Sequence, residues 1–156
     1  MCGIAGVIGS FEDDSDDILN SLKNRGPDFQ NFYQINNLVF FHSLLKIMDL
    51  SENSVQPMID QKTGNVIIFN GEIYNYNEIR KKYFPDSIFK SDTDTEVILK
   101  TYELFGNKVI EHLKGMFVFA IYDNKTKKVI IFRDTYGIKP LYYSILKNNF
   151  FFFFWY

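Results

Sequence analysis

The residue best suited to chemistry is Cys2, directly after the initiator Met1. Removal of Met1 would leave Cys2 with a free α-amine beside its own thiol. The ordinary pKa of an α-amine is about 8, so part of it is neutral near pH 7 and can accept the thiol proton. Nucleophile and base would then belong to one residue. From its position alone, a small buried packing cysteine is the commoner interpretation.

A thiolate that attacks an amide also needs hydrogen-bond donors for the developing oxyanion. The pair Asn70-Gly71 follows the apolar run 66–69, and Glu72 comes next. Asn70 offers a side-chain amide and Gly71 an accessible backbone N–H. An isolated Asn-Gly pair is more often an ordinary hairpin turn, so this pair gains meaning only together with Cys2.

The elements that must position these groups are mainly strands. Continuous apolar runs predict buried strands, and Thr93 with Glu96 has the spacing of a capping box at the start of a helix that Gly106 ends. Further predicted elements are strands at 4–8, 38–41, 116–122, 129–132 and 141–146, and helices at 75–82 and 108–113. An acidic cluster at 12–17 suits the first turn of a helix. These elements predict one α/β or α+β domain with mostly antiparallel sheets.

Length and composition exclude several classes of protein. The 156 residues suit one domain, and a net charge of −2 offers no basic field for nucleic acid. No apolar stretch is long enough for a membrane span, and no signal peptide is visible. The single cysteine indicates a reducing compartment, so we expect a cytoplasmic protein without nucleic-acid or membrane partners.

Five motifs occur in an order that is specific to one family. They are 1–6 (MCGIAG), 25–28 (RGPD), 70–75 (NGEIYN), 91–97 (SDTDTEV) and 133–143 (RDTYGIKPLYY). Over residues 1–149 the chain resembles the N-terminal glutaminase domain of glutamine-hydrolysing asparagine synthetases, a class II glutamine amidotransferase. Each motif is weak alone, and the five in order carry the resemblance.

The resemblance implies an α+β fold, the four-layer αββα sandwich of N-terminal-nucleophile hydrolases. It implies that Cys2 is the nucleophile and that Asn70 and Gly71 form the oxyanion hole. Glu72 and Asp94 would bind the α-ammonium group of glutamine. The implied reaction releases ammonia from glutamine through a thioester on Cys2. In the family, a synthetase domain or subunit uses that ammonia to convert aspartate to asparagine.

The chain contains no phosphate-binding loop and no cluster with metal-ligand spacing, and His42 and His112 are isolated. We therefore expect no cofactor in this chain. ATP and magnesium would bind only in the synthetase domain, which is absent from these residues.

The segment 42–49 departs from the family pattern. Leu44 occupies the position of an arginine that grips the α-carboxylate of glutamine, and leucine cannot do so. Lys46, two residues later, would share a strand face with Leu44 and is a candidate replacement cation. A solvated lysine is the competing interpretation.

Two other segments leave alternatives open. The turn 25–28 either has a direct substrate role or is a rigid turn with an Arg–Asp pair, whereas Arg133 and Asp134 suit a structural pair. Residues 150–156 are all aromatic and would form a tail beyond the domain, either a non-native product of a frameshift or a docking peptide. Together with Leu44, this tail keeps open a remnant or binding module with weak glutamine affinity. A third interpretation, an N-terminal-nucleophile amide hydrolase with another substrate, is disfavoured by residues 70–72 and Asp94.

Overall fold

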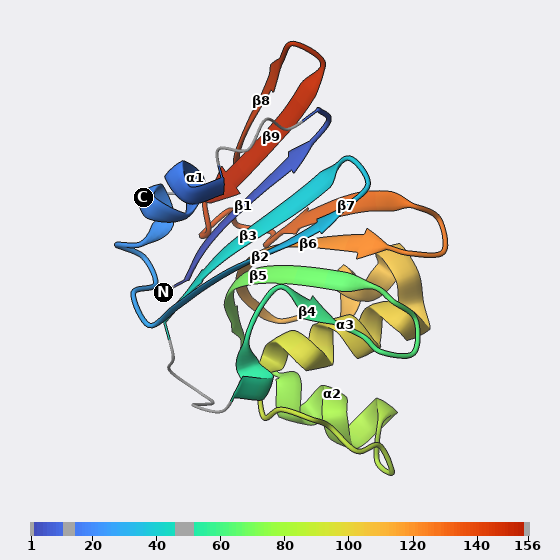
Figure 1. Cartoon of the computed structure of the whole chain (residues 1–156). Helices are drawn as coiled ribbons and strands as arrows, with labels where there is room; N and C mark the ends of the chain where they lie inside the picture. The colour runs from blue at the N-terminus through green and yellow to red at the C-terminus, as the bar shows by residue number, and fades with distance from the viewer. Residues whose placement is uncertain (1, 11–14, 46–51, 155–156) are drawn as a thin grey trace.

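Two antiparallel sheets form the centre of the molecule (Figure 1). The structure, a computed structural model, describes residues 2–10, 15–45 and 52–154. The first sheet has the order β2-β3-β1-β9-β8, with β1 (Gly3–Ile8), β2 (Phe29–Ile35), β3 (Leu38–Leu44), β8 (Tyr142–Leu146) and β9 (Asn149–Phe154). The second has the order β4-β5-β6-β7, with β4 (Met58–Ile59), β5 (Val66–Ile73), β6 (Gly115–Asp123) and β7 (Lys128–Arg133).

Helices cover the two outer faces of this pair of sheets (Figure 1). Helix α1 (Ser15–Leu22) packs on the first sheet, whereas α2 (Tyr76–Tyr83) and α3 (Asp94–Phe105) pack on the second. Two 3₁₀ helices, η1 (Glu52–Ser54) and η2 (Gly106–His112), complete the described elements. No helix within the described ranges is long and apolar enough to cross a bilayer.

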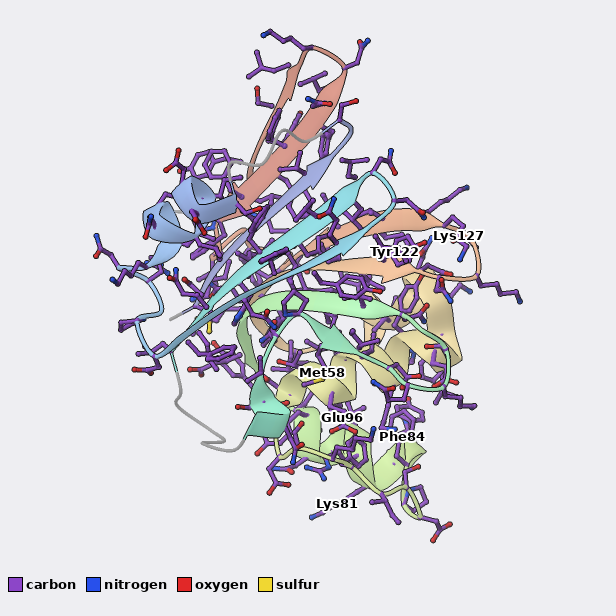
Figure 2. All side chains as sticks on the ribbon, in the orientation of Figure 1. Met58, Lys81, Phe84, Glu96, Tyr122 and Lys127 are labelled. Atoms are coloured by element: carbon purple, nitrogen blue, oxygen red, sulfur yellow. The ribbon has the colours of Figure 1, made fainter. Side chains whose placement is uncertain are left out.

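Three layers of apolar side chains hold the four layers of secondary structure together. In β5, Ile67 and Phe69 face the helices, and Val66 and Ile68 face the other sheet, because side chains alternate along a strand. Tyr122 of β6 (Figure 2) also belongs to the core between the sheets. A third cluster joins α1 to the outer face of the first sheet. The predicted αββα sandwich is confirmed.

The predicted aromatic tail is wrong for residues 150–154, because they form most of β9. This strand lies between β1 and β8, with Phe154 opposite Ile4 and Phe150 opposite Ile8. Phe152 and Phe154 are buried between the sheets, and Phe151 and Phe153 pack toward α1. The domain therefore extends beyond the predicted boundary at 149.

The capping-box spacing predicts the start of α3 correctly but not its hydrogen bonds. Thr93 is the N-cap residue, yet its side chain makes no cap hydrogen bond. Instead the carboxylate of Glu96, in the first turn of α3 and labelled in Figure 2, accepts hydrogen bonds from the backbone N–H groups of Lys90 and Ser91. Glu96 therefore ties the preceding loop to the helix. The segment 108–113, predicted as a short helix, lies mostly in the 3₁₀ helix η2.

Candidate active site

The predicted nucleophile directly precedes β1, and the predicted oxyanion donors lie in β5. Both strands direct side chains into the core between the two sheets. Ile4 of β1 and Ile68 of β5 lie in the core between the sheets. Because strand side chains alternate, Asn70 and Glu72 follow Ile68 onto that side. The Nδ2 atom of Asn70 donates a hydrogen bond to the carbonyl oxygen of Cys2. Residues 68 positions apart in the sequence therefore meet at the end of this layer.

Asn70 is held firmly beside the predicted nucleophile. Its side chain is buried, with only 1% of the residue exposed. Its Oδ1 atom is buried and has no hydrogen-bond partner among the described residues. Most buried polar atoms in proteins are paired, so an orphaned one marks a place where a ligand or water belongs. The role of Asn70 as an oxyanion donor stays a prediction, and its position next to Cys2 fits that role.

The backbone N–H of Gly71 faces the edge of β5 that β4 covers only at its beginning. On this edge, the N–H of Phe69 donates to Oε1 of Gln56 at 2.6 Å. The N–H of Ile73 donates to Oδ2 of Asp94 at 2.9 Å. Alternate N–H groups of a strand point to the same edge, so the Gly71 N–H lies between these two bonds.

Position 71 also requires glycine. A Cβ atom there would overlap the carbonyl oxygen of Met116 and lie 2.6 Å from Cα of Phe117. The φ angle of Gly71 is +154°, at the border of the region that L-residues rarely adopt. Only glycine therefore lets β6 pack closely here while the N–H faces the open edge.

Asp94 and Glu72 are two carboxylates near the end of β5. Asp94, only 4% exposed, stands at the start of α3 and accepts the Ile73 N–H, whereas Glu72 is exposed. The pKa of Asp94 is raised to about 6, mainly by burial and in smaller part by the charge of Glu72. A cation between two such carboxylates would relieve both effects. This arrangement suits the predicted ammonium site, which stays a prediction.

The thiol of Cys2 is not activated by its surroundings alone. Burial raises its pKa, and the nearby charge of Asp94 acts in the same direction. The Sγ atom lies 3.9 Å from the carbonyl oxygen of Leu45. The thiol is therefore protonated at neutral pH and needs a base, the part predicted for the α-amine of Cys2. Met1, whose removal would free that amine, lies outside the described residues.

The sequence matches a family model described as "Glutamine amidotransferase domain" over residues 1–154. The chain belongs to this family. Asparagine synthetase [glutamine-hydrolyzing] 2 of Bacillus subtilis is 36% identical over 96% of the chain, which covers 21% of that protein. Asparagine synthetase B [glutamine-hydrolyzing] of Escherichia coli is 35% identical over 91% of the chain, which covers 26% of that protein. The chain thus spans between about a fifth and a quarter of these relatives' length.

Solved structures show the same fold. The glutamine phosphoribosylpyrophosphate amidotransferase of B. subtilis matches 97% of the chain with a TM-score of 0.75 and 18% identity, and the match covers 41% of that protein. The predicted fold of N-terminal-nucleophile hydrolases is thereby confirmed for this amidotransferase domain.

Position 44 of the amidotransferase domain lies directly beside Cys2. In the register of β1 and β3, Gly3 is opposite Ser43, so the next pair along the strands is Cys2 and Leu44. Leu44 is buried, with 5% of the residue exposed. The position at which the resemblance implies an arginine is therefore apolar here. Lys46, the predicted replacement cation, lies outside the described residues.

His42 and His112 are packing residues in this amidotransferase domain. His42 is fully buried, and neither ring nitrogen has a hydrogen-bond partner within the described part of the chain. Burial lowers the pKa of His42 to about 3, and the backbone of Phe69 offsets only part of this shift, so the ring is neutral. His112 stacks on Phe105 with 3.9 Å between ring centroids.

The turn after β7 has a structural role, but Arg133 and Asp134 do not act there as a pair. The Asp134 carboxylate accepts the backbone N–H groups of Ile138 and Lys139. Arg133 donates to the carbonyl oxygens of Gly137 and Lys139, each at 2.6 Å. Each side chain therefore holds the turn by itself.

Sequence reasoning missed two residues near the site. The Oε1 atom of Gln56 accepts a hydrogen bond from the Phe69 N–H. Lys139 is only 3% exposed, burial lowers its pKa, and Arg25, Glu72 and Cys2 also affect that pKa. Neither residue has a local sequence signal, because both are defined by partners that are distant along the chain. Lys139 does lie in the motif 133–143, but its residue type and spacing there do not single it out as a site residue.

Proposed function

We propose that this amidotransferase domain is a glutaminase that supplies ammonia to a synthetase domain or subunit, which forms asparagine from aspartate with ATP. The observation that carries the proposal is the contact between Asn70 and Cys2 beside the open edge of β5. The likeness to asparagine synthetases of two bacteria supports the choice of acceptor. ATP and magnesium belong, in this proposal, to the synthetase partner, and the reaction runs in the cytoplasm, where thiols stay reduced.

In the first half of the reaction, the neutral α-amine of Cys2 takes the thiol proton. The thiolate then attacks the side-chain amide carbon of glutamine. The Gly71 N–H and the Asn70 amide stabilise the oxyanion, for which Nδ2 leaves the Cys2 carbonyl. The carbon–nitrogen bond breaks, and the α-ammonium group returns its proton to the departing ammonia. A γ-glutamyl thioester on Cys2 remains.

In the second half, water replaces ammonia. The α-amine of Cys2 removes a proton from water, which attacks the thioester carbon through the same oxyanion hole. The carbon–sulfur bond breaks, the thiolate regains its proton, and glutamate leaves. Throughout, Asp94 and Glu72 hold the substrate's ammonium group between one buried and one exposed carboxylate.

The test is ammonia release from glutamine by protein whose loss of Met1 has been verified by mass spectrometry. We expect release by the wild type and none by Cys2→Ala. Asn70→Ala should lower kcat about 100- to 1,000-fold through loss of one oxyanion donor. A variant with one alanine inserted before Cys2 is the matched control for the base, since it keeps the thiol but lacks the free amine at Cys2. Equal release by wild type and Cys2→Ala, or none by folded wild type, contradicts the proposal.

Leu44 favours a second candidate function, a fold remnant or binding module with weak glutamine affinity. Loss of a charge-assisted contact to the substrate carboxylate costs about 1.5–3 kcal/mol of binding. In this alternative the folded wild type releases no ammonia. Cys2→Ala then binds glutamine no better than it binds alanine in calorimetry.

A further inference from the structure

The apolar side chain at position 44 leaves the α-carboxylate of glutamine without its expected partner in the proposed site. A carboxylate that enters a half-buried site needs charge-assisted hydrogen bonds to replace its water. The ammonium site at Asp94 and Glu72 cannot supply them, because both residues carry negative charge or none. A cation other than residue 44 must therefore take this part if glutamine binds.

Arg25 reaches this end of the layer from the loop after α1. A Cβ atom built on Gly3, the neighbour of Cys2, would lie 3.2 Å from Cβ of Arg25. The Arg25 guanidinium carbon lies 4.8 Å from the ring centroid of Phe154. Phe154 is paired with Ile4 of β1, so its ring faces the layer into which Asn70 also points.

The backbone of this loop is fixed against the strand that carries Leu44. The N–H of Asp28 donates to the carbonyl oxygen of Leu44 at 3.1 Å. A side chain at Gly26 would overlap the carbonyl group of Ser43, so the loop can approach the strand this closely only with glycine there. Arg25 therefore belongs to a loop whose backbone packs against Ser43 and Leu44, where the resemblance implies an arginine.

The guanidinium of Arg25 has an unused binding edge. Its Nε and Nη2 atoms are both buried, and neither has a hydrogen-bond partner among the described residues. These two donors lie on the same edge of the planar group and form the fork that binds a carboxylate with two parallel bonds. Buried donors without partners cost free energy, and a bound carboxylate would recover it.

The charges around Arg25 also favour an anion. Lys139 is a second buried cation, and the charge of Arg25, after burial itself, lowers the pKa of Lys139. The carboxylates of Glu72 and Asp134 and the thiol of Cys2 act on Lys139 in the opposite direction. Lys139 already interacts with another group of the protein, so the open fork of Arg25 is the better ligand for a carboxylate.

We propose that Arg25 binds the α-carboxylate of glutamine through Nε and Nη2, in place of the arginine that the family has at position 44. The proposal rests on the glutaminase function proposed above. It places the substrate's carboxylate toward the first sheet and its ammonium group toward Asp94 at the second sheet. Both groups are bonded to the α-carbon of glutamine, so the side chain with its amide extends from there toward Cys2.

The experiment measures ammonia release by the wild type, Arg25→Met, Arg25→Met/Leu44→Arg and Arg80→Met. Arg25→Met should raise KM for glutamine about 10- to 100-fold with little change in kcat, because the carboxylate contact is made equally in the ground state and the transition state. Leu44→Arg should restore KM in the Arg25→Met protein. Arg80, whose guanidinium carbon lies 4.1 Å from the ring centroid of Phe89, is the matched control on another part of the molecule and should leave KM unchanged.

L-glutaminamide, which lacks the α-carboxylate, supplies an independent readout. The wild type should prefer glutamine over this analogue, and Arg25→Met should lose most of that preference. Ammonia release with the same KM and the same preference in Arg25→Met overturns the role of Arg25 and leaves the proposed function intact.

Calorimetry separates the opposite case. If the folded wild type releases no ammonia, glutamine is titrated into Cys2→Ala with and without Arg25→Met. Weaker binding in the double variant supports the carboxylate site although the proposed function has failed. Equal binding in both proteins, or none in either, overturns the site.

Discussion

Two turns of this domain contain an arginine, and the two arginines differ in whether their side chains make hydrogen bonds within the protein. In the turn after β7, Arg133 donates to the carbonyl oxygens of Gly137 and Lys139, and the Asp134 carboxylate takes backbone N–H groups of the same turn. In the turn after α1, the backbone is equally well fixed, yet Nε and Nη2 of Arg25 are buried without a partner in the described part of the chain.

The difference separates a turn built for stability from a turn built for a ligand. A polar group whose hydrogen bonds are all made inside the protein contributes to folding and has nothing left for a substrate. A buried group that stays unpaired costs stability, and a ligand can recover that cost. Asn70, with its unpaired Oδ1 atom beside Cys2, belongs with Arg25 by this criterion. The following predictions test the criterion on both sides.

The largest effect on stability should come from Asp134→Ala. Asp134 is 5% exposed, and its carboxylate accepts N–H groups of Phe117, Ile138 and Lys139. We expect a loss of about 3 kcal/mol in the free energy of unfolding, because two buried donors and one partly buried donor lose their acceptor. Urea unfolding measures the loss, and Asp134→Asn, which keeps one acceptor oxygen, should lose less. An unchanged urea midpoint in Asp134→Ala would show that the hydrogen bonds of this turn do not stabilise the fold.

The same substitution at the two arginines makes the comparison direct. Arg133→Met should lower the free energy of unfolding by about 2 kcal/mol, because two charge-assisted bonds to carbonyl oxygens disappear. Arg25→Met should leave it unchanged or raise it, since it removes two unpaired donors. Thermal unfolding of both variants, without ligand, measures the contrast. Equal losses at the two positions would show that Arg25 is a structural residue as well.

Continuous apolar runs in the sequence were sufficient to predict the buried strands at the centre of the second sheet. The runs at 66–69 and 116–122 lie in β5 and β6 as expected. β9 was missed because five successive phenylalanines show no alternation, although the fold assigns Phe152 to one side of the sheet and Phe153 to the other. β2 was missed because its exposed and half-buried residues include polar ones and form no apolar run.

The site divides in a similar way. Cys2, Asn70 and Asp94 could be named because their motifs resemble those of a family, and the fold brings them together. The role of Arg25 stayed open because it depends on which hydrogen bonds its side chain does not make. A missing bond has no sequence signal, since it is decided by the packing of segments that are distant along the chain.

Asp94→Asn extends the comparison to a buried carboxylate of the site. The pKa of Asp94, raised by burial from 3.8 to about 6, means that its contribution to stability is full below pH 3.8 and lost as the pH rises through 6. At pH 7.5 the asparagine variant, which keeps an oxygen for the Ile73 N–H, should therefore be more stable by about 1–2 kcal/mol. Its advantage should vanish near pH 4, and its glutamine affinity should fall.

Thermal unfolding from pH 4 to 7.5 and glutamine titration check both parts. Asp123→Asn is the control, because the pKa of that carboxyl is lowered: burial opposes the shift, and hydrogen bonds from Thr126 and Tyr102 outweigh it. Asp123→Asn should destabilise the protein at pH 7.5. Destabilisation by both substitutions would show that the Asp94 carboxylate stabilises the fold, as Asp134 does.

The smallest effect concerns His42, which is unpaired like Arg25 but has no route to a substrate charge because its ring stays neutral. Its pKa falls on burial from 6.5 to about 3, so its contribution to stability is present above pH 6.5 and is lost as the pH falls toward 3. Between pH 7 and 5.5 this loss amounts to about 1 kcal/mol. Over the same range the shift of Asp94 acts with the opposite sign and hides part of it.

His42→Leu should therefore be studied in the Asp94→Asn protein. There the leucine substitution should leave stability at pH 7.5 nearly unchanged and abolish the loss between pH 7 and 5.5, as measured by urea unfolding at each pH. A pH dependence that persists after the substitution would mean that other groups cause it and that the pKa of the buried His42 ring is not lowered as expected. If the dependence disappears, His42 is an unpaired buried group without a ligand, and an unpaired buried atom marks a ligand site only where it also lies near Cys2, as at Asn70 and Arg25.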